Sequence, residues 1–104
     1  GNWDGFEWIN ADDADRSIFS FVRYSATGRQ NLLFVCNFTP VSRPDYRVGV
    51  PKSGNYTLIL DETHGSYKTG DQKIVFKAKK SECDGQPYSI AYPLPAYGTA
   101  IFRF

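Results

Sequence analysis

Hydrophobic and polar residues alternate along short segments of this chain, and turn residues separate one segment from the next. Residues 73–79 alternate cleanly, whereas in residues 17–24 Ile18 and Val22 share one face of an extended strand while Phe19 and Phe21 share the other. Both faces carry apolar side chains, so this strand is expected to be covered on each side, by a second sheet or by a neighbouring domain. No segment shows a convincing helical period, and strands are predicted throughout.

Other short apolar segments repeat this pattern. Residues 32–38 are apolar on both faces and are expected to form a central strand. About eight strands are expected in all, at residues 6–9, 17–24, 32–38, 47–50, 56–60, 73–79, 88–92 and 99–104. Alternation predicts inward side chains at a further set of positions: Tyr56, Leu58, Leu60, Ile74, Phe76 and Ala78.

Prolines and polar residues mark the connections between these segments. Residues 39–45 contain Pro40 and Pro44 and are predicted to cross over outside any ladder, because proline has no N–H to donate. Residues 62–72 are predicted to form a polar loop, and residues 93–95 separate the last two strands. Together these signals predict an all-β fold, an antiparallel Greek-key β-sandwich of about eight strands.

The length of the chain fits one domain. Its 104 residues lie near the commonest domain size, and no linker or internal repeat divides them. Methionine is absent even from position 1. Residues 1–104 are therefore expected to be a single domain excised from a larger protein.

Charge and hydropathy limit the partners. The 12 Lys and Arg residues nearly balance the 11 Asp and Glu residues, so no field of one sign favours nucleic acid or an anionic membrane. Apolar runs also stop well short of the about 20 residues that span a bilayer. Neither nucleic acid nor a membrane is expected as a partner.

No group of residues has the spacing of a catalytic or metal site. The acidic run at residues 10–15 lacks the glycine and glutamate of a calcium loop, and the single histidine, His64, lies in a loop-like segment. Cys36 lies in an apolar run and Cys83 in a polar segment, so a disulfide and two free thiols remain alternatives. No catalytic residue, metal or cofactor is expected.

Aromatic residues are the remaining candidates, because sugar-binding modules stack sugar rings on exposed aromatic side chains. Most tyrosines and tryptophans here fall at inward strand positions, where packing explains them. Tyr67 lies in a polar segment instead and is the candidate for stacking against a sugar ring.

Several blocks of the sequence resemble one family. The most specific are VCNFTPV at residues 35–41 and YRVGVP at residues 46–51. Shorter blocks agree with them: GFEWI at 5–9, DDAD at 12–15, S-I-x-S-F at 17–21, G-x-Y at 54–56, LD at 60–61, G-x-P-Y-S at 85–89 and LP at 94–95. Together they resemble the C-terminal domain of bacterial 1,4-α-glucan (glycogen) branching enzymes of the α-amylase superfamily. The stretch at residues 64–70 departs from the Gly-, Ser- and Asn-rich loop that this family usually carries.

The resemblance implies a cytoplasmic, non-catalytic accessory domain. The parent enzyme would cleave an α-1,4 glucan chain and transfer it to form an α-1,6 branch, with its catalytic carboxylates in a (β/α)8 barrel outside this sequence. That barrel would be the partner of the domain, and α-glucan a further one. Trp3, Phe6 and Trp8 lie where the family's chain leaves the barrel, and we expect them to dock the sandwich onto it. Packing of Trp8 inside the sandwich is the alternative.

Two other functions fit the same fold. An independent carbohydrate-binding module would place its aromatic residues on one exposed sheet or loop rim. An adhesion domain of the immunoglobulin or fibronectin type shares the sandwich architecture, and fold alone does not separate such functions. The missing Cys…Trp…Cys arrangement argues against the adhesion domain.

Overall fold

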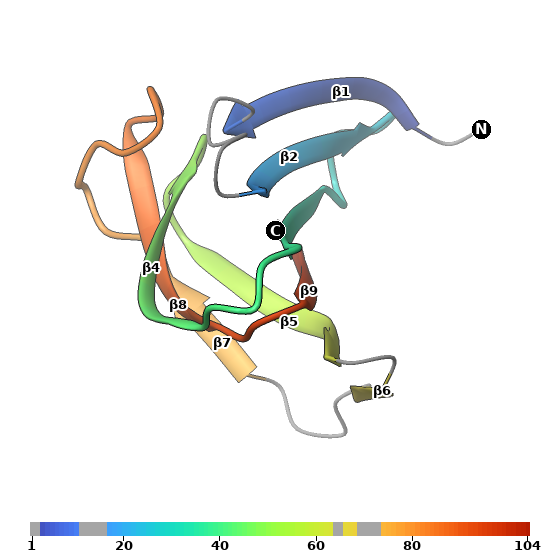
Figure 1. The fold of residues 1–104 in the computed structure, drawn as a ribbon. Coiled ribbons are helices and arrows are strands. Elements are labelled where there is room, and N and C mark those ends of the chain that lie inside the picture. Colours follow the sequence, from blue (N-terminus) through green and yellow to red (C-terminus); the bar gives the residue numbers. More distant parts are fainter. Residues whose placement is uncertain (1–2, 11–16, 64–65, 69–73) are drawn as a thin grey trace.

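Nine strands make up the structure, a computed structural model that describes the backbone of residues 3–10, 17–63, 66–68 and 74–104. Side chains are described for these residues except 3, 4, 10, 63 and 66–68. The strands are β1 (Trp3–Asn10), β2 (Ile18–Ser25), β3 (Leu32–Asn37), β4 (Arg43–Val50), β5 (Asn55–Thr63), β6 (Ser66–Lys68), β7 (Ile74–Lys77), β8 (Tyr88–Leu94) and β9 (Gly98–Arg103) (Figure 1). The described residues include no helix that could cross a membrane.

The strands form one large and one small antiparallel sheet. The large sheet has the order β1-β2-β3-β9-β5-β6, and β7 pairs with the first half of β5. The small sheet consists of β4 and β8. Because β9 inserts between β3 and β5, the last strand of the chain closes the centre of the large sheet (Figure 1). The expected all-β antiparallel sandwich is confirmed.

The hydrophobic core lies between the two sheets. Alternate residues of β2, β3 and β9 point into it, and Ile18, Val22, Leu33, Val35 and Phe102 are all 0% exposed. The small sheet contributes the buried side chains of the other layer: Val48, Val50, Ile90, Tyr92 and Leu94. The small sheet therefore covers one face of the large sheet, the inner face.

Two buried polar side chains fix the connections around this core. Asn37, at the end of β3, donates from Nδ2 to the carbonyl oxygens of Val41 (2.9 Å) and Pro95 (3.0 Å). Its Oδ1 accepts from the backbone N–H (2.9 Å) and the hydroxyl (2.7 Å) of Thr39. Asn37 thus ties the β3–β4 connection to the β8–β9 turn, and each of its polar atoms is satisfied.

Tyr56 makes the equivalent link at the start of β5. Its hydroxyl donates to the Lys52 carbonyl oxygen (2.8 Å) and accepts from the Lys52 N–H (3.3 Å). A tyrosine bonded to the backbone a few residues upstream is a recurring corner of Greek-key sandwiches. Burial raises the pKa of Tyr56 to about 12.

The sequence predicted that Pro44 and Pro93 lie outside the strands, and both predictions are wrong. The fourth strand begins at Arg43 and includes Pro44, and the eighth strand runs through Pro93 to Leu94. The ladder between them is irregular from Arg43 to Tyr46, opposite Pro93. Proline is tolerated at a bulge and on an edge strand, and β4 pairs only with β8 among the described strands.

Three predictions around β5 also need correction. A bulge between Leu58 and Leu60 turns Leu60 to the face of Ile101, so Leu60 does not point inward. Ile74 is 48% exposed at the start of an edge strand rather than inward. The predicted polar loop at residues 62–72 includes the end of β5 and all of β6, which form a hairpin.

Candidate docking face

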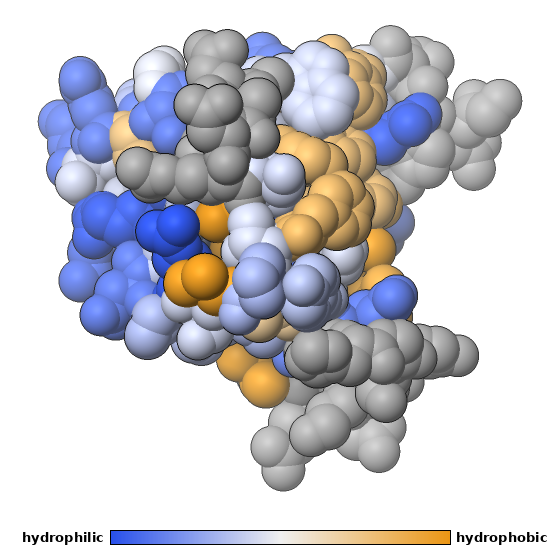
Figure 2. Space-filling model, in the orientation of Figure 1, coloured by the Kyte–Doolittle hydropathy of each residue, from blue (hydrophilic) through white to orange (hydrophobic). Residues whose placement is uncertain are grey.

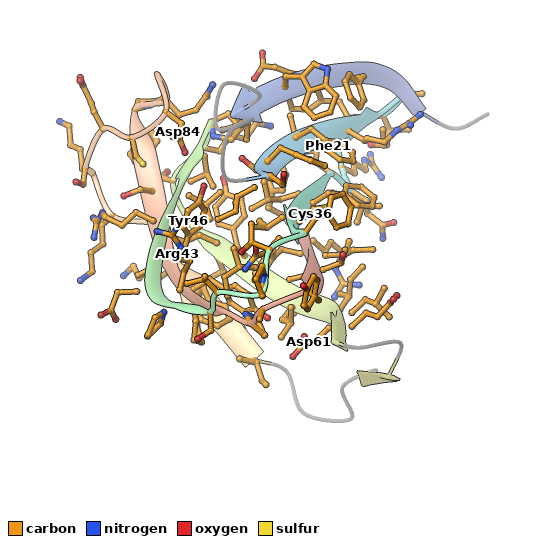
Figure 3. All side chains as sticks on the ribbon, viewed as in Figure 1. Phe21, Cys36, Arg43, Tyr46, Asp61 and Asp84 are labelled. Carbon is orange, nitrogen blue, oxygen red and sulfur yellow. The ribbon has the colours of Figure 1, made fainter. Side chains whose placement is uncertain are left out.

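The face of the large sheet that points away from the small sheet carries aromatic side chains. We call Phe6, Trp8, Phe19, Phe21, Phe34 and Phe38 together the outer aromatic face. Figure 3 places Phe21 on β2 and Cys36 on β3, away from the small sheet that carries Arg43 and Tyr46. Directly paired residues of neighbouring strands lie on the same face of a sheet, so the register determines which residues stand side by side.

One row of this face is apolar across five strands. The register pairs Trp8 with Phe21, Phe21 with Phe34, Phe34 with Ile101, and Ile101 with Leu60. The row below it on the sheet runs from Phe6 through Arg23, Leu32 and Arg103. The row above it runs from Phe19 through Cys36 and Thr99 to Glu62. Charged side chains therefore stand only around the apolar row.

The rings of the outer aromatic face contact one another. Phe21 stacks on Phe34 with ring centroids 4.7 Å apart and planes 6° apart. Trp8 meets Phe21 edge to face at 5.3 Å. Phe19 links the group to Phe38 at 5.2 Å. Centroid distances of 4.5–7 Å are those of favourable aromatic pairs, so these rings form one connected cluster.

Water reaches this cluster. Phe6 is 49% exposed, Trp8 51% and Phe38 57%, whereas the inner side chains of the same sheet are buried. Figure 2 shows hydrophobic side chains gathered at the surface over β1, β2 and β3. Contiguous apolar surface of this kind marks a site of contact with another protein surface or a ligand.

Two groups on this face are chemically distinct from their neighbours. The Arg23 guanidinium carbon lies 5.9 Å from the centre of the Phe6 ring, a cation–π contact. Cys36 is 8% exposed, and burial raises the pKa of its thiol, an effect that a hydrogen bond with Thr99 partly offsets. A buried thiol with a raised pKa is a poor nucleophile at neutral pH, so Cys36 contributes packing.

Comparison with known proteins identifies the family. The model of the alpha amylase C-terminal all-beta domain matches residues 8–104. The chain belongs to this family.

Two relatives of this α-amylase C-terminal domain are named as branching enzymes. The chain is 47% identical over 105 residues to a 1,4-alpha-glucan branching enzyme of Butyrivibrio fibrisolvens, a match that covers 99% of this chain and 16% of that protein. It is 40% identical to a branching enzyme of Gloeobacter violaceus, over 95% of this chain and 14% of that protein. The chain thus spans about a sixth of the length of these relatives.

The predicted docking residues of this α-amylase C-terminal domain lie on β1. Phe6 and Trp8 both belong to the outer aromatic face, and the 51% exposure of Trp8 differs from the alternative of burial inside the sandwich. Trp3 also lies in β1, but its side chain is outside the described residues. Tyr67 lies in β6, where side chains are likewise not described.

Four members of the outer aromatic face were not predicted as site residues: Phe19, Phe21, Phe34 and Phe38. The signal was present in part, because alternation already separated Phe19 and Phe21 from Ile18 and Val22. The missing step was the register between strands. Pairing of Arg23 with Leu32 around the turn at Gly28, whose φ is 70°, aligns Phe21 with Phe34.

Other places in the domain offer less chemistry. The described residues contain no group of three metal-ligating side chains, and the side chains of the acidic run at residues 10–15 lie outside the described part of the chain. Both cysteines are free thiols. A hollow of about 410 Å³ is lined by Glu82, Cys83, Asp84, Gly85, Gln86 and Pro87. These belong to an Asp84–Gly85 hairpin whose Asp84 Oδ2 accepts from the Gly49 N–H (3.0 Å), so the hairpin packs on β4.

Proposed function

We propose that residues 1–104 form a non-catalytic accessory domain of a 1,4-α-glucan branching enzyme, and that the outer aromatic face docks this domain onto the rest of the enzyme. The observation that carries the proposal is the apolar row from Trp8 to Leu60, which crosses five strands on the face opposite the small sheet. Membership of the α-amylase C-terminal family and the names of the relatives support the remainder of such an enzyme as the partner.

The energetics favour a covered face. Full burial of a Phe side chain is worth roughly 1.5–3 kcal/mol relative to exposure in water, and the three most exposed rings retain about half of their accessible surface. Trp, Phe and Arg are also the side chains enriched at the centres of protein interfaces. A contact that buries this face would therefore stabilise both surfaces.

The parent enzyme gives the domain its context. Such an enzyme cleaves an α-1,4 glucan chain and rejoins it through an α-1,6 linkage in glycogen biosynthesis in the cytoplasm, and its catalytic residues lie in a barrel outside this sequence. The role of residues 1–104 is then mechanical: the domain shields and stabilises the barrel surface. Trp3 as a further docking residue and Tyr67 as a glucan-stacking residue remain predictions.

Hydroxyl-radical footprinting tests the docking directly. The 104-residue chain and the intact branching enzyme that carries it are labelled side by side, and modification is read at each residue by mass spectrometry. We expect Phe6 and Trp8 to be labelled several-fold less in the intact enzyme, because the barrel covers them. Ile74, 48% exposed at the start of β7, is the matched control and should be labelled equally in both. Equal labelling of Trp8 in the two samples contradicts docking through this face.

Substitution provides the second arm of the test. In the intact enzyme, Phe6→Ser combined with Trp8→Ser should lower the temperature at which the domain unfolds and separate its transition from that of the barrel in scanning calorimetry. Ile74→Ser should leave both transitions in place. Maltoheptaose titration of the 104-residue chain distinguishes the carbohydrate-binding alternative, which requires chemical-shift changes at Phe6 and Trp8.

A further inference from the structure

One end of the outer aromatic face carries positive charge. Arg23 pairs with Leu32, and Leu32 pairs with Arg103, so the two arginines flank one leucine on the same face. Two strand spacings separate them, about 10 Å. A guanidinium is charged at every physiological pH, so this end of an otherwise apolar face holds two fixed positive charges.

The side chain of Arg23 contains a buried hydrogen-bond donor without an acceptor in the described part of the chain. Its Nε is buried, and no acceptor for it lies among the described residues. The Arg23 guanidinium also lies over the face of the Phe6 ring, a contact that favours its charge but accepts no N–H in the plane of the guanidinium. A buried donor without an acceptor costs about 1–3 kcal/mol, and more when it is charged.

The described carboxylates of the large sheet lie elsewhere. Glu7 pairs with Val22, whose side chain is in the core, so Glu7 stands on the opposite face of the sheet from Arg23. Glu62 pairs with Thr99, which lies four residue positions along β9 from the Arg23–Leu32–Arg103 row, and β5 lies three strands away from β2. Docking would remove the remaining water from the half-buried Arg23 guanidinium, and this desolvation of its charge is costly unless the covering surface supplies an acceptor.

We infer that the barrel surface that covers the outer aromatic face places a carboxylate against Arg23, beside Leu32. This inference rests on the proposed docking. A carboxylate matches both the charge and the planar two-donor edge of a guanidinium, which a backbone carbonyl does not. The apolar row supplies contact area, and the Arg23–carboxylate pair fixes how the domain is placed on the barrel.

Zero-length cross-linking in the intact branching enzyme tests the pair. Arg23→Lys puts an amine where the guanidinium stood, and a carbodiimide joins that amine to an adjacent carboxylate as an amide, with loss of water. Mass spectrometry then locates the linked residue. We expect a link from position 23 to an Asp or Glu outside residues 1–104. Arg47→Lys, at an exposed position of β4 in the small sheet, is the control and should give no link beyond residues 1–104.

The outcomes separate the two proposals. A link from position 23 only to carboxylates within residues 1–104, or no link at all, overturns the inference. If Trp8 is still protected in footprinting, docking stands and only the carboxylate fails; if Trp8 is labelled freely, both fail. As a second measurement, Arg23→Met should lower the unfolding temperature of the domain in the intact enzyme by about 5 °C or more. Lys80→Met, at an exposed loop position, should leave it unchanged, and equal shifts in the two variants overturn the inference.

Discussion

The two faces of the large sheet differ in how far their side chains are exposed, although the same strands form both. On the inner face, Val22, Leu33 and Val35 are all 0% exposed beneath the small sheet. On the outer face, Trp8 and Phe21 come from the same pair of strands, yet half of Trp8 remains accessible. Strand alternation therefore makes two apolar surfaces here, and the chain covers one of them.

The two faces also differ in the kind of residue they use. The inner face is largely aliphatic, and β-branched and Leu side chains fill a core at close packing. The outer face combines aromatic rings with two arginines, Arg23 and Arg103. Aromatic residues and Arg retain a polar or quadrupolar edge that water tolerates, which is why they are favoured at surfaces that alternate between exposed and covered. The larger share of aliphatic side chains among the buried residues thus adds to the difference in exposure between the inner face and the outer aromatic face.

The sharpest test compares two phenylalanines of adjacent strands. Phe102 lies in the inner face against Tyr92, with ring centroids 5.1 Å apart, and is 0% exposed. Phe102→Ala should destabilise the 104-residue chain by about 3–5 kcal/mol, because it leaves a cavity in the core. Phe34→Ala on the outer face should cost about 1–2 kcal/mol, since water can fill the space.

Urea denaturation of the chain and of the intact enzyme measures both variants. In the intact enzyme the cost of Phe34→Ala should rise toward that of Phe102→Ala, because docking converts the outer face into a second core. A Phe34→Ala cost that is the same in the chain and in the enzyme would mean that nothing covers Phe34 in the enzyme.

The next comparison uses two neighbours in the sequence that point to opposite faces. Asn37 is fully buried and joins two connections through four hydrogen bonds. Asn37→Ala removes one of two donors from each of the Val41 and Pro95 carbonyl oxygens and the shared acceptor of the Thr39 N–H and hydroxyl, and it should cost about 3 kcal/mol of unfolding free energy. Phe38→Ala, at a ring that is 57% exposed, should cost less than about 1 kcal/mol in the 104-residue chain.

Thermal unfolding of the two variants checks this difference. The loss in Asn37→Ala should also show in the turn at Tyr97, whose backbone N–H donates to the Thr39 carbonyl oxygen (3.0 Å). Faster amide exchange at Tyr97 in Asn37→Ala alone would locate the damage. Equal destabilisation by the two substitutions would mean that the outer aromatic face contributes as much to the stability of the 104-residue chain as the buried hydrogen bonds of Asn37.

Local pattern predicted the two faces but not their extent. Alternation over residues 17–24 separates Ile18 and Val22 from Phe19 and Phe21, and this needs nothing beyond the two-residue period of a strand. The apolar row across five strands depends on register, and β9 comes from the far end of the chain. Contacts between distant segments carry no local periodicity, so the sequence marked Phe6 and Trp8 without Phe34.

Bulges explain most of the errors in strand assignment. Leu60 changes face because one extra residue enters β5 beside β9. Pro44 enters β4 at an irregular part of its ladder with β8. The bulge in β5 and the irregular pairing of β4 both depend on which strand lies alongside. Prolines and alternation within a single segment therefore do not predict them. The hydrogen bonds of Asn37 were not predicted for a similar reason, since one of its partners, Pro95, lies 58 residues away in the sequence.

The last effect we predict uses pH, and it acts on the inner face alone because the rings of the outer aromatic face do not titrate. Burial is the main cause that raises the pKa of Tyr56 from 10.0 to about 12, and the bond from the Lys52 N–H partly offsets it. The unfolded chain therefore releases the Tyr56 proton at lower pH than the folded one. The stabilising effect of the protonated phenol is complete below about pH 10 and is lost as the pH rises through about 12. From about pH 9 to about pH 11.5 this group should cost the folded state about 2 kcal/mol.

Comparison with Tyr56→Phe isolates that contribution. The variant loses the hydrogen bond to the Lys52 carbonyl and should be about 1–2 kcal/mol less stable near neutral pH. Buried Tyr92, whose pKa is raised by burial and by Asp61, titrates in both proteins and cancels in the difference. Urea denaturation across this range should show the two stability curves converge at high pH. Parallel curves would mean that Tyr56 ionises as readily in the fold as in the unfolded chain, and that water reaches the inner face as it reaches the outer one.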